Sequence, residues 1–181
     1  MINDKELIEG CIAGKPKYQQ MLYDRYASAM FGICKRYTRS STEAEDMLQD
    51  VFVKIFLNLN KFRMESSLGY WIKRLTINTL VSNYRKKKIE DHEVDIDEMS
   101  EQLPAVTVSP EKSIPMDVLL EMINSLPEGY RTVFNLREID GYELQEIADT
   151  LQCTNVTVRS QLFKAKSALK KKIESWMKYE I

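Results

Sequence analysis

The sequence has few of the residues on which tight turns, disulfides and metal sites depend. Glycine occurs six times and proline five times in 181 residues, which argues against an all-β fold and favours long helices. The three cysteines, Cys11, Cys34 and Cys153, lie far apart without C-x-x-C spacing, so they predict neither a disulfide framework nor a zinc site. There is no run of eighteen apolar residues and no secretory signal, so we expect a cytoplasmic protein with no direct membrane insertion.

The chain also has little with which to build an active site. His92 is its one histidine, and it lies in a strongly acidic stretch. No glycine-rich phosphate-binding loop of either common spacing occurs. A hydrolase built on His92 would need partners that the sequence does not offer. We therefore expect no enzyme, no cofactor and no metal.

Charge is distributed unevenly along the chain, although it sums to only −1. The net charge is +7 over residues 1–88, −7 over 89–113, −6 over 114–149 and +5 over 150–181. Binding to a polyanion depends on local charge, because each neutralised phosphate releases condensed counterions. The two basic blocks therefore permit two separate contacts with nucleic acid.

Four helices are predicted in residues 1–88, which we expect to form one compact bundle. The first spans 5–13, with Leu7, Ile8 and Ile12 on its apolar side. The second spans 18–37, where apolar residues recur at spacings of three and four: Met21, Leu22, Tyr26, Met30, Ile33 and Cys34. Thr42 is the expected N-cap of the third, whose core face is Leu48, Phe52, Phe56 and Leu59. A loop over 60–67 leads to the fourth, 68–88.

Residues 89–113 contain two prolines and alternating acidic residues, a composition that predicts a flexible linker. The remaining residues, 114–181, are predicted to form a second bundle with helices at 115–125, 128–139, 143–151 and 155–177. Pro127 fits the first turn of the helix at 128–139, and Asp140-Gly141 fits its end. We therefore expect an all-α protein of two small helical bundles joined by an acidic linker.

The last two helices are separated by three residues and have the pattern of a helix-turn-helix. One apolar stripe is Leu144, Ile147, Ala148 and Leu151, and the next is Val158, Leu162, Ala165 and Leu169. The predicted outward side of the last helix is Thr157, Arg159, Ser160, Gln161, Phe163, Lys164 and Lys166. Such donors bind phosphates and base edges. Any helical hairpin with two stripes shows the same spacing, however, and Phe163 fits a thymine methyl, a sugar or a neighbouring helix.

Two stretches, taken together, resemble one protein family. Residues 44–62 (AEDMLQDVFVKIFLNLNKF) and 69–88 (GYWIKRLTINTLVSNYRKKK) resemble region 2 of the sigma-70 superfamily, and residues 123–169 resemble region 4. With a direct linker and neither region 1.1 nor region 3, the chain is similar to an extracytoplasmic-function (ECF) sigma factor. The resemblance implies domains at 1–88 (region 2) and 114–181 (region 4).

The resemblance assigns roles to individual residues of region 2. The polar face of the third helix, Asp46, Gln49 and Asp50, would dock on a coiled coil of the polymerase β′ subunit. The implied readers of the promoter's minus-ten element are Lys61, Phe62, Arg63, Trp71, Arg74, Asn78 and Arg85. Capture of unstacked bases requires such a basic groove with an aromatic side chain. A tryptophan at the spacing of Trp71 is also typical of a helix core.

Region 4 of the family reads the minus-thirty-five element with the start of its last helix. The resemblance implies base contacts by Arg159, Ser160 and Phe163 and backbone contacts by Thr157, Lys164 and Lys166. The sequence departs from the common pattern at Gln152 and Val156, where many relatives have glycine. Because a non-glycine residue with positive φ is uncommon, the turn at Gln152 is expected to differ slightly from the usual one.

The sequence thus predicts a sigma factor that directs core RNA polymerase to specific promoters and performs no catalysis itself. The implied partners are the β′ and β subunits of the core polymerase, promoter DNA and, as a further candidate, an anti-sigma factor. The acidic linker fits both the path of the family's connector through a basic RNA channel and a solubilising spacer. The competing interpretation is a free-standing helix-turn-helix regulator, which would bind duplex DNA alone, as a dimer on a palindrome.

Overall fold

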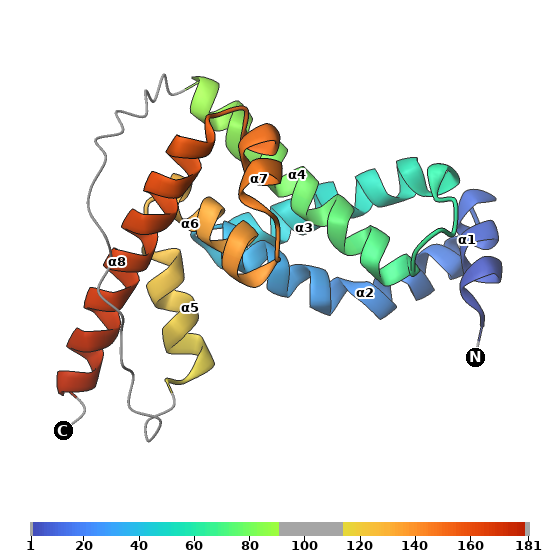
Figure 1. Ribbon diagram of the computed structural model, residues 1–181. Helices are drawn as coiled ribbons and strands as arrows, with labels where there is room; N and C mark the ends of the chain where they lie inside the picture. Colours follow the sequence, from blue (N-terminus) through green and yellow to red (C-terminus); the bar gives the residue numbers. More distant parts are fainter. Residues whose placement is uncertain (1, 91–113, 180–181) are drawn as a thin grey trace. The chain divides into compact units, whose positions relative to one another are not determined.

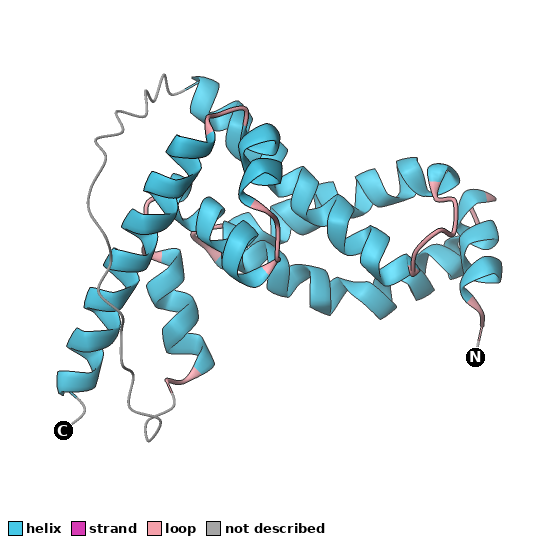
Figure 2. Ribbon diagram, viewed as in Figure 1, coloured by secondary structure: helices cyan, strands magenta, loops and turns pink. Residues whose placement is uncertain are grey.

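The computed structural model describes residues 2–90 and 114–179, and within these ranges every regular element is a helix (Figures 1 and 2). The prediction of an all-α fold is confirmed. The chain divides into two compact units, Met1–Asn83 and Tyr84–Ile181, so the division falls inside a long helix that ends at Glu90. Most of the predicted linker at 89–113, His92 included, lies outside the described residues.

The first unit consists of helices packed around one aliphatic core. Its elements are α1 (Asp4–Ile12), α2 (Pro16–Tyr37), α3 (Ser41–Asn58), the 3-10 turn η1 (Leu59–Lys61) and most of α4 (Leu68–Glu90). α2 and α3 pack against each other, and α1 packs on α2 and η1. The most deeply buried aliphatic side chains come from all of these elements: Leu7, Leu22, Val51, Ile55, Leu59, Leu68 and Ile72.

Two local expectations for this unit are wrong. Ile12 is 52% exposed, and Cys11 is buried in its place. The reason is that the buried side of α1, which also includes Ile8 and Gly10, is centred between Leu7 and Cys11, and Ile12 lies about 120° around the helix from that centre. Thr42 does not cap α3, because the Ser40 hydroxyl accepts a hydrogen bond from the Glu43 amide at 3.1 Å and the helix begins directly after Ser40.

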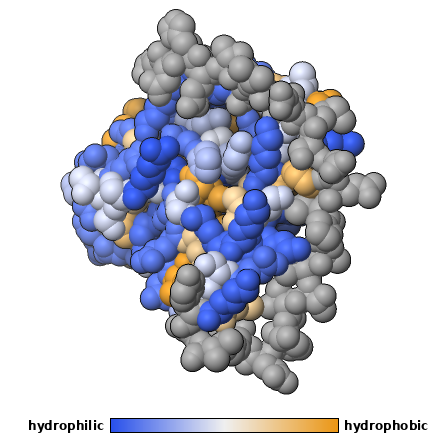
Figure 3. Space-filling view, turned by 90° about the vertical axis from the view of Figure 1, so that its left-hand side faces the viewer, coloured by the Kyte–Doolittle hydropathy of each residue, from blue (hydrophilic) through white to orange (hydrophobic). Residues whose placement is uncertain are grey.

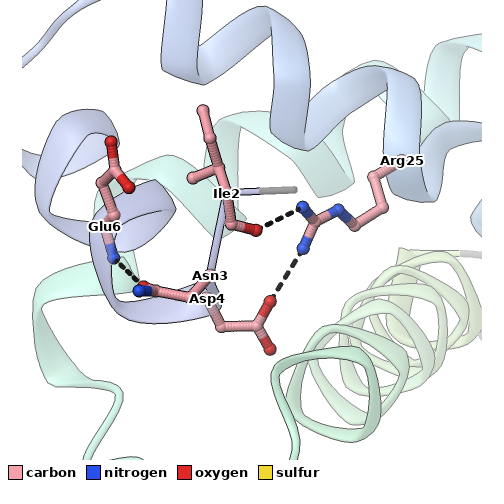
Figure 4. Close-up of polar contacts among 5 residues, drawn as sticks. All are labelled: Ile2, Asn3, Asp4, Glu6 and Arg25. Atoms are coloured by element: carbon pink, nitrogen blue, oxygen red, sulfur yellow. Dashed lines mark hydrogen bonds and ion pairs between the residues drawn. The ribbon is translucent and has the colours of Figure 1, made fainter.

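The start of α1 is held to α2 by polar contacts (Figure 4). Asn3 caps α1, since its side-chain oxygen accepts a hydrogen bond from the Glu6 amide at 2.8 Å. Arg25 of α2 pairs with Asp4 at 2.7 Å and donates to the Ile2 carbonyl at 3.4 Å. Because the Arg25–Asp4 pair is partly exposed, it contributes about 0–1 kcal/mol to stability. The Asn3 cap therefore marks where α1 begins, and Arg25 links this end of the helix to α2.

The end of α1 lies directly against α2 at Gly10. A Cβ atom at this position would collide with the Tyr18 ring, so only glycine allows the two helices to approach this closely. The same helix also packs on η1, from which the predicted minus-ten loop continues. The approach at Gly10 thus helps to set the position of that loop.

The second unit is centred on α8 (Asn155–Tyr179), which packs against α5 (Met116–Asn124), α6 (Glu128–Phe134) and α7 (Leu144–Leu151). Its core contains a cluster of Ile123, Leu126, Ala165 and Leu169.

On the side of the molecule seen in Figure 3, most of the surface is hydrophilic and apolar residues form narrow strips. None of the described helices combines the length and apolar character needed to span a membrane.

The helix predicted at 128–139 is present but changes character before it ends. Its last five residues form a π-helical turn, η2 (Asn135–Ile139), which closes with a hydrogen bond from the Asp140 amide to the Asn135 carbonyl at 2.9 Å. Gly141 then has φ 80, so the predicted stop is confirmed. Pro127 precedes the helix instead of lying in its first turn, because its ψ of 145 is extended.

We expect Gly10→Ala to destabilise the first unit by about 1–3 kcal/mol, because the added methyl group must displace the Tyr18 ring. Gly32→Ala is the matched control. Apart from its chain neighbours and the backbone of its own helix, no heavy atom lies within 4 Å of its added Cβ, so helix propensity should make it stabilising by about 0.5–1 kcal/mol. Urea denaturation followed by circular dichroism compares the two. Equal midpoints would contradict the packing of α1 on Tyr18.

Burial makes two of the three thiols unreactive. Desolvation raises the pKa of Cys34 to about 11 and also raises the pKa of Cys11, so both remain protonated at neutral pH. Cys153 is partly exposed. Because the thiolate is the nucleophile, iodoacetamide at about pH 8 should modify Cys153 in the native protein, and Cys34 only near its raised pKa or after unfolding. Peptide mass spectrometry measures this, and equal rates in the native protein would contradict the burial of Cys34.

Candidate nucleic-acid interface

Four of the predicted minus-ten residues form one line along α4. At about 100° per residue, Trp71, Arg74, Asn78 and Arg85 fall within about 60° of arc, and the line is about 21 Å long. Arg74 and Asn78 are exposed, and Trp71 and Arg85 are partly exposed. The far side of the helix, including Leu80, is buried. α4 therefore presents an aromatic ring, two guanidinium groups and an amide on one face.

The loop before α4 folds onto the first turn of that helix. The Phe62 and Trp71 rings lie with their centroids 5.3 Å apart and their planes inclined by 45°. Ser67 begins the helix, since its hydroxyl accepts a hydrogen bond from the Tyr70 amide at 3.2 Å. Lys61 donates to the Asn58 side-chain oxygen at 2.9 Å. The loop thus holds Trp71 in place. Its partial exposure lies between the two interpretations that its spacing allowed, a core residue and a base-stacking residue.

Two exposed residues near this loop were missed by the sequence analysis. Met64 has left-handed backbone with φ 57 and a side chain that is 54% exposed. Strained backbone of this kind clusters at functional sites. No sequence signal marks it, because methionine has no preference for this conformation. Tyr70 is 57% exposed and could have been found, since it lies four residues before Arg74 and therefore on a neighbouring part of the α4 face.

The predicted docking residues Asp46, Gln49 and Asp50 are all exposed on α3. The same stripe continues with Val53, 57% exposed, and Leu57, 70% exposed. All five fall within about 100° of arc, opposite the buried stripe of the helix. The sequence analysis missed the two apolar residues, although their spacing of seven and eleven from Asp46 placed them on this side. The α3 face is therefore acidic at its start and apolar at its end.

The helix-turn-helix is formed by α7, a tight turn and α8. Gln152 itself has the left-handed conformation, with φ 54 and ψ 45, so the turn keeps the backbone that glycine favours. The Cys153 amide donates to the Ala148 carbonyl at 3.0 Å and closes the end of α7. The Thr154 hydroxyl then accepts a hydrogen bond from the Thr157 amide at 3.1 Å, which starts α8.

Contacts before the helix-turn-helix fix its first helix. Arg137 of η2 donates to the Tyr142 carbonyl at 2.9 Å and pairs with Glu143 at 3.0 Å. The Glu143 amide donates in turn to the Glu146 carboxylate at 2.8 Å, in the first turn of α7. The sequence analysis named none of these residues, because the π-helical turn that brings Arg137 to Tyr142 has no sequence signature.

All six predicted minus-thirty-five residues are at least partly exposed. Arg159 is exposed, and Thr157, Ser160, Phe163 and Lys164 are partly exposed. The sixth residue, Lys166, is partly exposed but pairs with Glu138 of η2 at 2.8 Å. All six lie on α8.

One residue of the predicted outward side of α8 is placed wrongly. Gln161 is only 4% exposed. It follows Val158 by three residues and precedes Ala165 by four, so it lies on the buried side with them. Val156, at the second position of α8, is 55% exposed.

The described residues offer no site for a metal ion: residues 2–90 and 114–179 contain no group of three or more His, Cys, Asp or Glu side chains placed to hold one. The exposed side chains of α3, α4 and α8 are suited to binding, through ion pairs, hydrogen bonds and stacking, and each set lies on one side of its helix.

Known protein families match both parts of this sequence. The family model described as Sigma-70 region 2 matches residues 22–89, and the one described as Sigma-70, region 4 matches residues 116–169. The chain is 31% identical to the RNA polymerase sigma-H factor of Pseudomonas aeruginosa, with 94% of each protein covered. It is also 31% identical to the ECF RNA polymerase sigma-E factor of Escherichia coli K12, with 96% of this chain and 95% of that protein covered.

The fold is also similar to a solved structure, the sigma factor RpoE in complex with the anti-sigma factor NepR from Bartonella quintana. The TM-score is 0.54 at 21% sequence identity, and the match covers 86% of this chain and 96% of that one. The two region matches occur in the predicted order, and the sequence relatives extend over nearly the whole chain. The chain therefore belongs to the sigma-70 family and, within it, to the RNA polymerase sigma factors of the ECF type.

Proposed function

We propose that three helical faces of this sigma factor divide the work of promoter recognition. One observation carries the proposal: α3, α4 and α8 each bury one side and present residues of a different chemical kind on the other. The α3 face is acidic and apolar, the α4 face is aromatic and cationic, and the α8 face is polar and cationic. Each face fits one of three targets, namely a protein helix pair, an unpaired DNA strand and a DNA duplex.

The α3 face, made of Asp46, Gln49, Asp50, Val53 and Leu57, is proposed to bind a coiled coil of the polymerase β′ subunit. Interfaces between proteins commonly have an apolar centre with a polar rim. Val53 and Leu57 supply exposed apolar surface, and the two aspartates beside them attract basic side chains. This composition supports docking of another protein more than binding of DNA, because carboxylates repel phosphates.

The α4 face and the loop at 60–67 are proposed to capture the unpaired strand of the minus-ten element. Stacking of a base on an aromatic side chain contributes about 1–3 kcal/mol. Phe62 and Trp71 supply the rings, and Arg63, Arg74 and Arg85 supply charge for the backbone. Asn78, exposed on the same face, offers an amide for a base edge. Lys61 is the remaining member of this proposed set.

The start of α8 is proposed to read the duplex at minus thirty-five. Recognition helices of this motif contact base edges with their N-terminal residues. Arg159, Ser160 and Phe163 are the proposed base readers, and Thr157 and Lys164 the backbone contacts. Lys166, which pairs with Glu138 through one of its three ammonium donors, is a further proposed backbone contact.

The remaining proposals concern the protein as a whole. We infer domains at 1–88 and 114–181 with a linker at 89–113, action in the cytoplasm together with the β′ and β subunits, and catalysis supplied by the polymerase alone. The Bartonella protein of similar fold is bound by an anti-sigma factor. An anti-sigma factor is accordingly a proposed partner of this chain as well.

Run-off transcription with purified core polymerase and a genomic fragment library tests the proposed function. We expect discrete transcripts and DNase protection only when the chain and the core enzyme are both present. A free-standing regulator would instead protect duplex DNA by itself, at a palindrome, and would give no transcript. That result would contradict the proposal.

The docking face has a matched control one residue away. Asp46→Asn and Leu57→Ala should each weaken binding to core polymerase by about 1–2 kcal/mol, which is the loss of binding free energy expected when a contributing interface residue is changed. Glu45→Gln removes a charge from an exposed residue that lies about 100° around α3 from Asp46, outside the arc of the docking face, and should change binding by less than about 0.5 kcal/mol. Titration of labelled protein with core polymerase measures the difference. Similar losses for Asp46→Asn and Glu45→Gln would remove α3 from the docking surface.

Arg159 and Lys166 are expected to behave differently. Arg159→Ala should lower discrimination between the correct minus-thirty-five sequence and a scrambled one by about 1–3 kcal/mol, if the guanidinium contacts guanine. Lys166→Ala should weaken both sequences alike, because a phosphate contact carries no sequence information. Competition binding with the holoenzyme measures both. A uniform loss for Arg159→Ala would count against its role in base reading.

A further inference from the structure

An exposed valine lies at the start of the proposed recognition helix. Val156 is the second residue of α8, and 55% of its surface is exposed. Fixed backbone precedes it, because Gln152 closes α7 and Thr154 caps α8. The position of Val156 is therefore set by the turn, and its exposure is not a consequence of a frayed helix end.

Val156 lies at the centre of the outward side of α8. Val158, Gln161, Ala165 and Leu169 form the buried side of the helix. At about 100° per residue, the middle of that buried set is about 180° from Val156. Arg159, Ser160 and Phe163 flank Val156 on the outward side, since they follow it by three, four and seven residues. An apolar group thus lies between the residues proposed to read bases.

We propose that Val156 contacts the C5-methyl group of a thymine in the minus-thirty-five duplex and makes that base pair part of the recognised sequence. The inference rests on the proposed function of α8 and adds a specificity-determining residue to it. In the major groove, thymine presents an O4 acceptor and a C5-methyl group, and this methyl group, which cytosine lacks, is the part that apolar side chains contact. A single valine side chain is also about the right size to pack against one methyl group.

The surroundings favour DNA over a protein partner at Val156. Residues 150–181 have a net charge of +5, and Arg159 lies one turn away. A protein interface would need a wider apolar centre than one valine surrounded by polar and cationic groups. Valine is also restricted to essentially one rotamer in a helix, so its two methyl groups are already ordered before binding.

Deoxyuridine scanning tests this proposal, because deoxyuridine differs from thymidine only by the missing C5-methyl group of the base. Holoenzyme is assembled from the full chain and core polymerase, and its binding to promoter duplexes is measured by fluorescence anisotropy. Each thymine of the protected minus-thirty-five segment is replaced in turn. With the wild-type chain, one replacement should weaken binding about fourfold, the factor that corresponds to one buried methyl-sized group.

Val156→Ala should bind unmodified promoter more weakly and should lose no further affinity at that deoxyuridine. Met116→Ala is the matched control, since Met116 is an exposed apolar residue of the same unit on α5, 78% exposed, and should retain the full deoxyuridine effect. Alanine favours helix at both positions, and circular dichroism verifies the fold of both variants.

The outcomes separate this inference from the proposed function. Loss of the deoxyuridine effect in Val156→Ala alone supports the methyl contact. Sequence-specific binding in which no deoxyuridine matters, or in which Val156→Ala and wild type respond alike, overturns the role of Val156 and leaves the proposed function standing. A holoenzyme that does not bind promoter duplexes at all overturns both.

Discussion

Burial of one side of each long helix determines which residues the other side presents. In α3, Leu48, Val51 and Ile55 are buried, so Asp46, Asp50 and the residues in line with them are exposed. The same relation holds for α4 and α8. A shift of one residue in any of these helices would rotate the outward side chains by about 100° and break the set. The proposed binding surfaces therefore depend on the cores beneath them, because core packing holds the orientation of each helix.

The connections between helices determine where each helix begins and how closely neighbouring helices approach. Ser67 begins α4 and Thr154 begins α8, each through a hydroxyl that accepts a backbone hydrogen bond. In the first unit, α1 approaches α2 at Gly10 and packs on η1, the turn before the minus-ten loop. α1 lies before residue 22, where the match to region 2 begins, yet it supports the part of that region which is proposed to hold unpaired bases.

Much of this arrangement could be predicted from the sequence. The order of the two regions follows from the resemblance to the sigma-70 family. The stop after η2 at Asp140-Gly141 follows from the left-handed conformation that glycine permits. The apolar periodicities of α2, α7 and α8 follow from residue spacing, because a helix with one buried side must repeat apolar residues every three or four positions. Gln161 shows the limit of that rule. Its spacing from Val158 and Ala165 places it on the buried side, but its polar side chain led to its assignment to the outward side.

Other features depend on choices that the sequence leaves nearly equal in energy. Ser40 and Thr42 are both good caps, and the backbone conformation before α3 decides between them. The left-handed conformations of Met64 and Gln152 are imposed by neighbouring elements against the preference of those residues. The π-helical turn that brings Arg137 to Tyr142 likewise arises from packing and has no local signature.

The central claim is that the outward sides of α4 and α8 act on different states of DNA. The most direct measurement compares two probes on one holoenzyme that carries Arg74→Ala and Asn78→Ala: DNase protection of the minus-thirty-five duplex, and permanganate reactivity of unpaired thymines at minus ten. We predict that the protection is retained and the reactivity is lost. Retention of both, or loss of both together, would contradict the division of labour between the two helices.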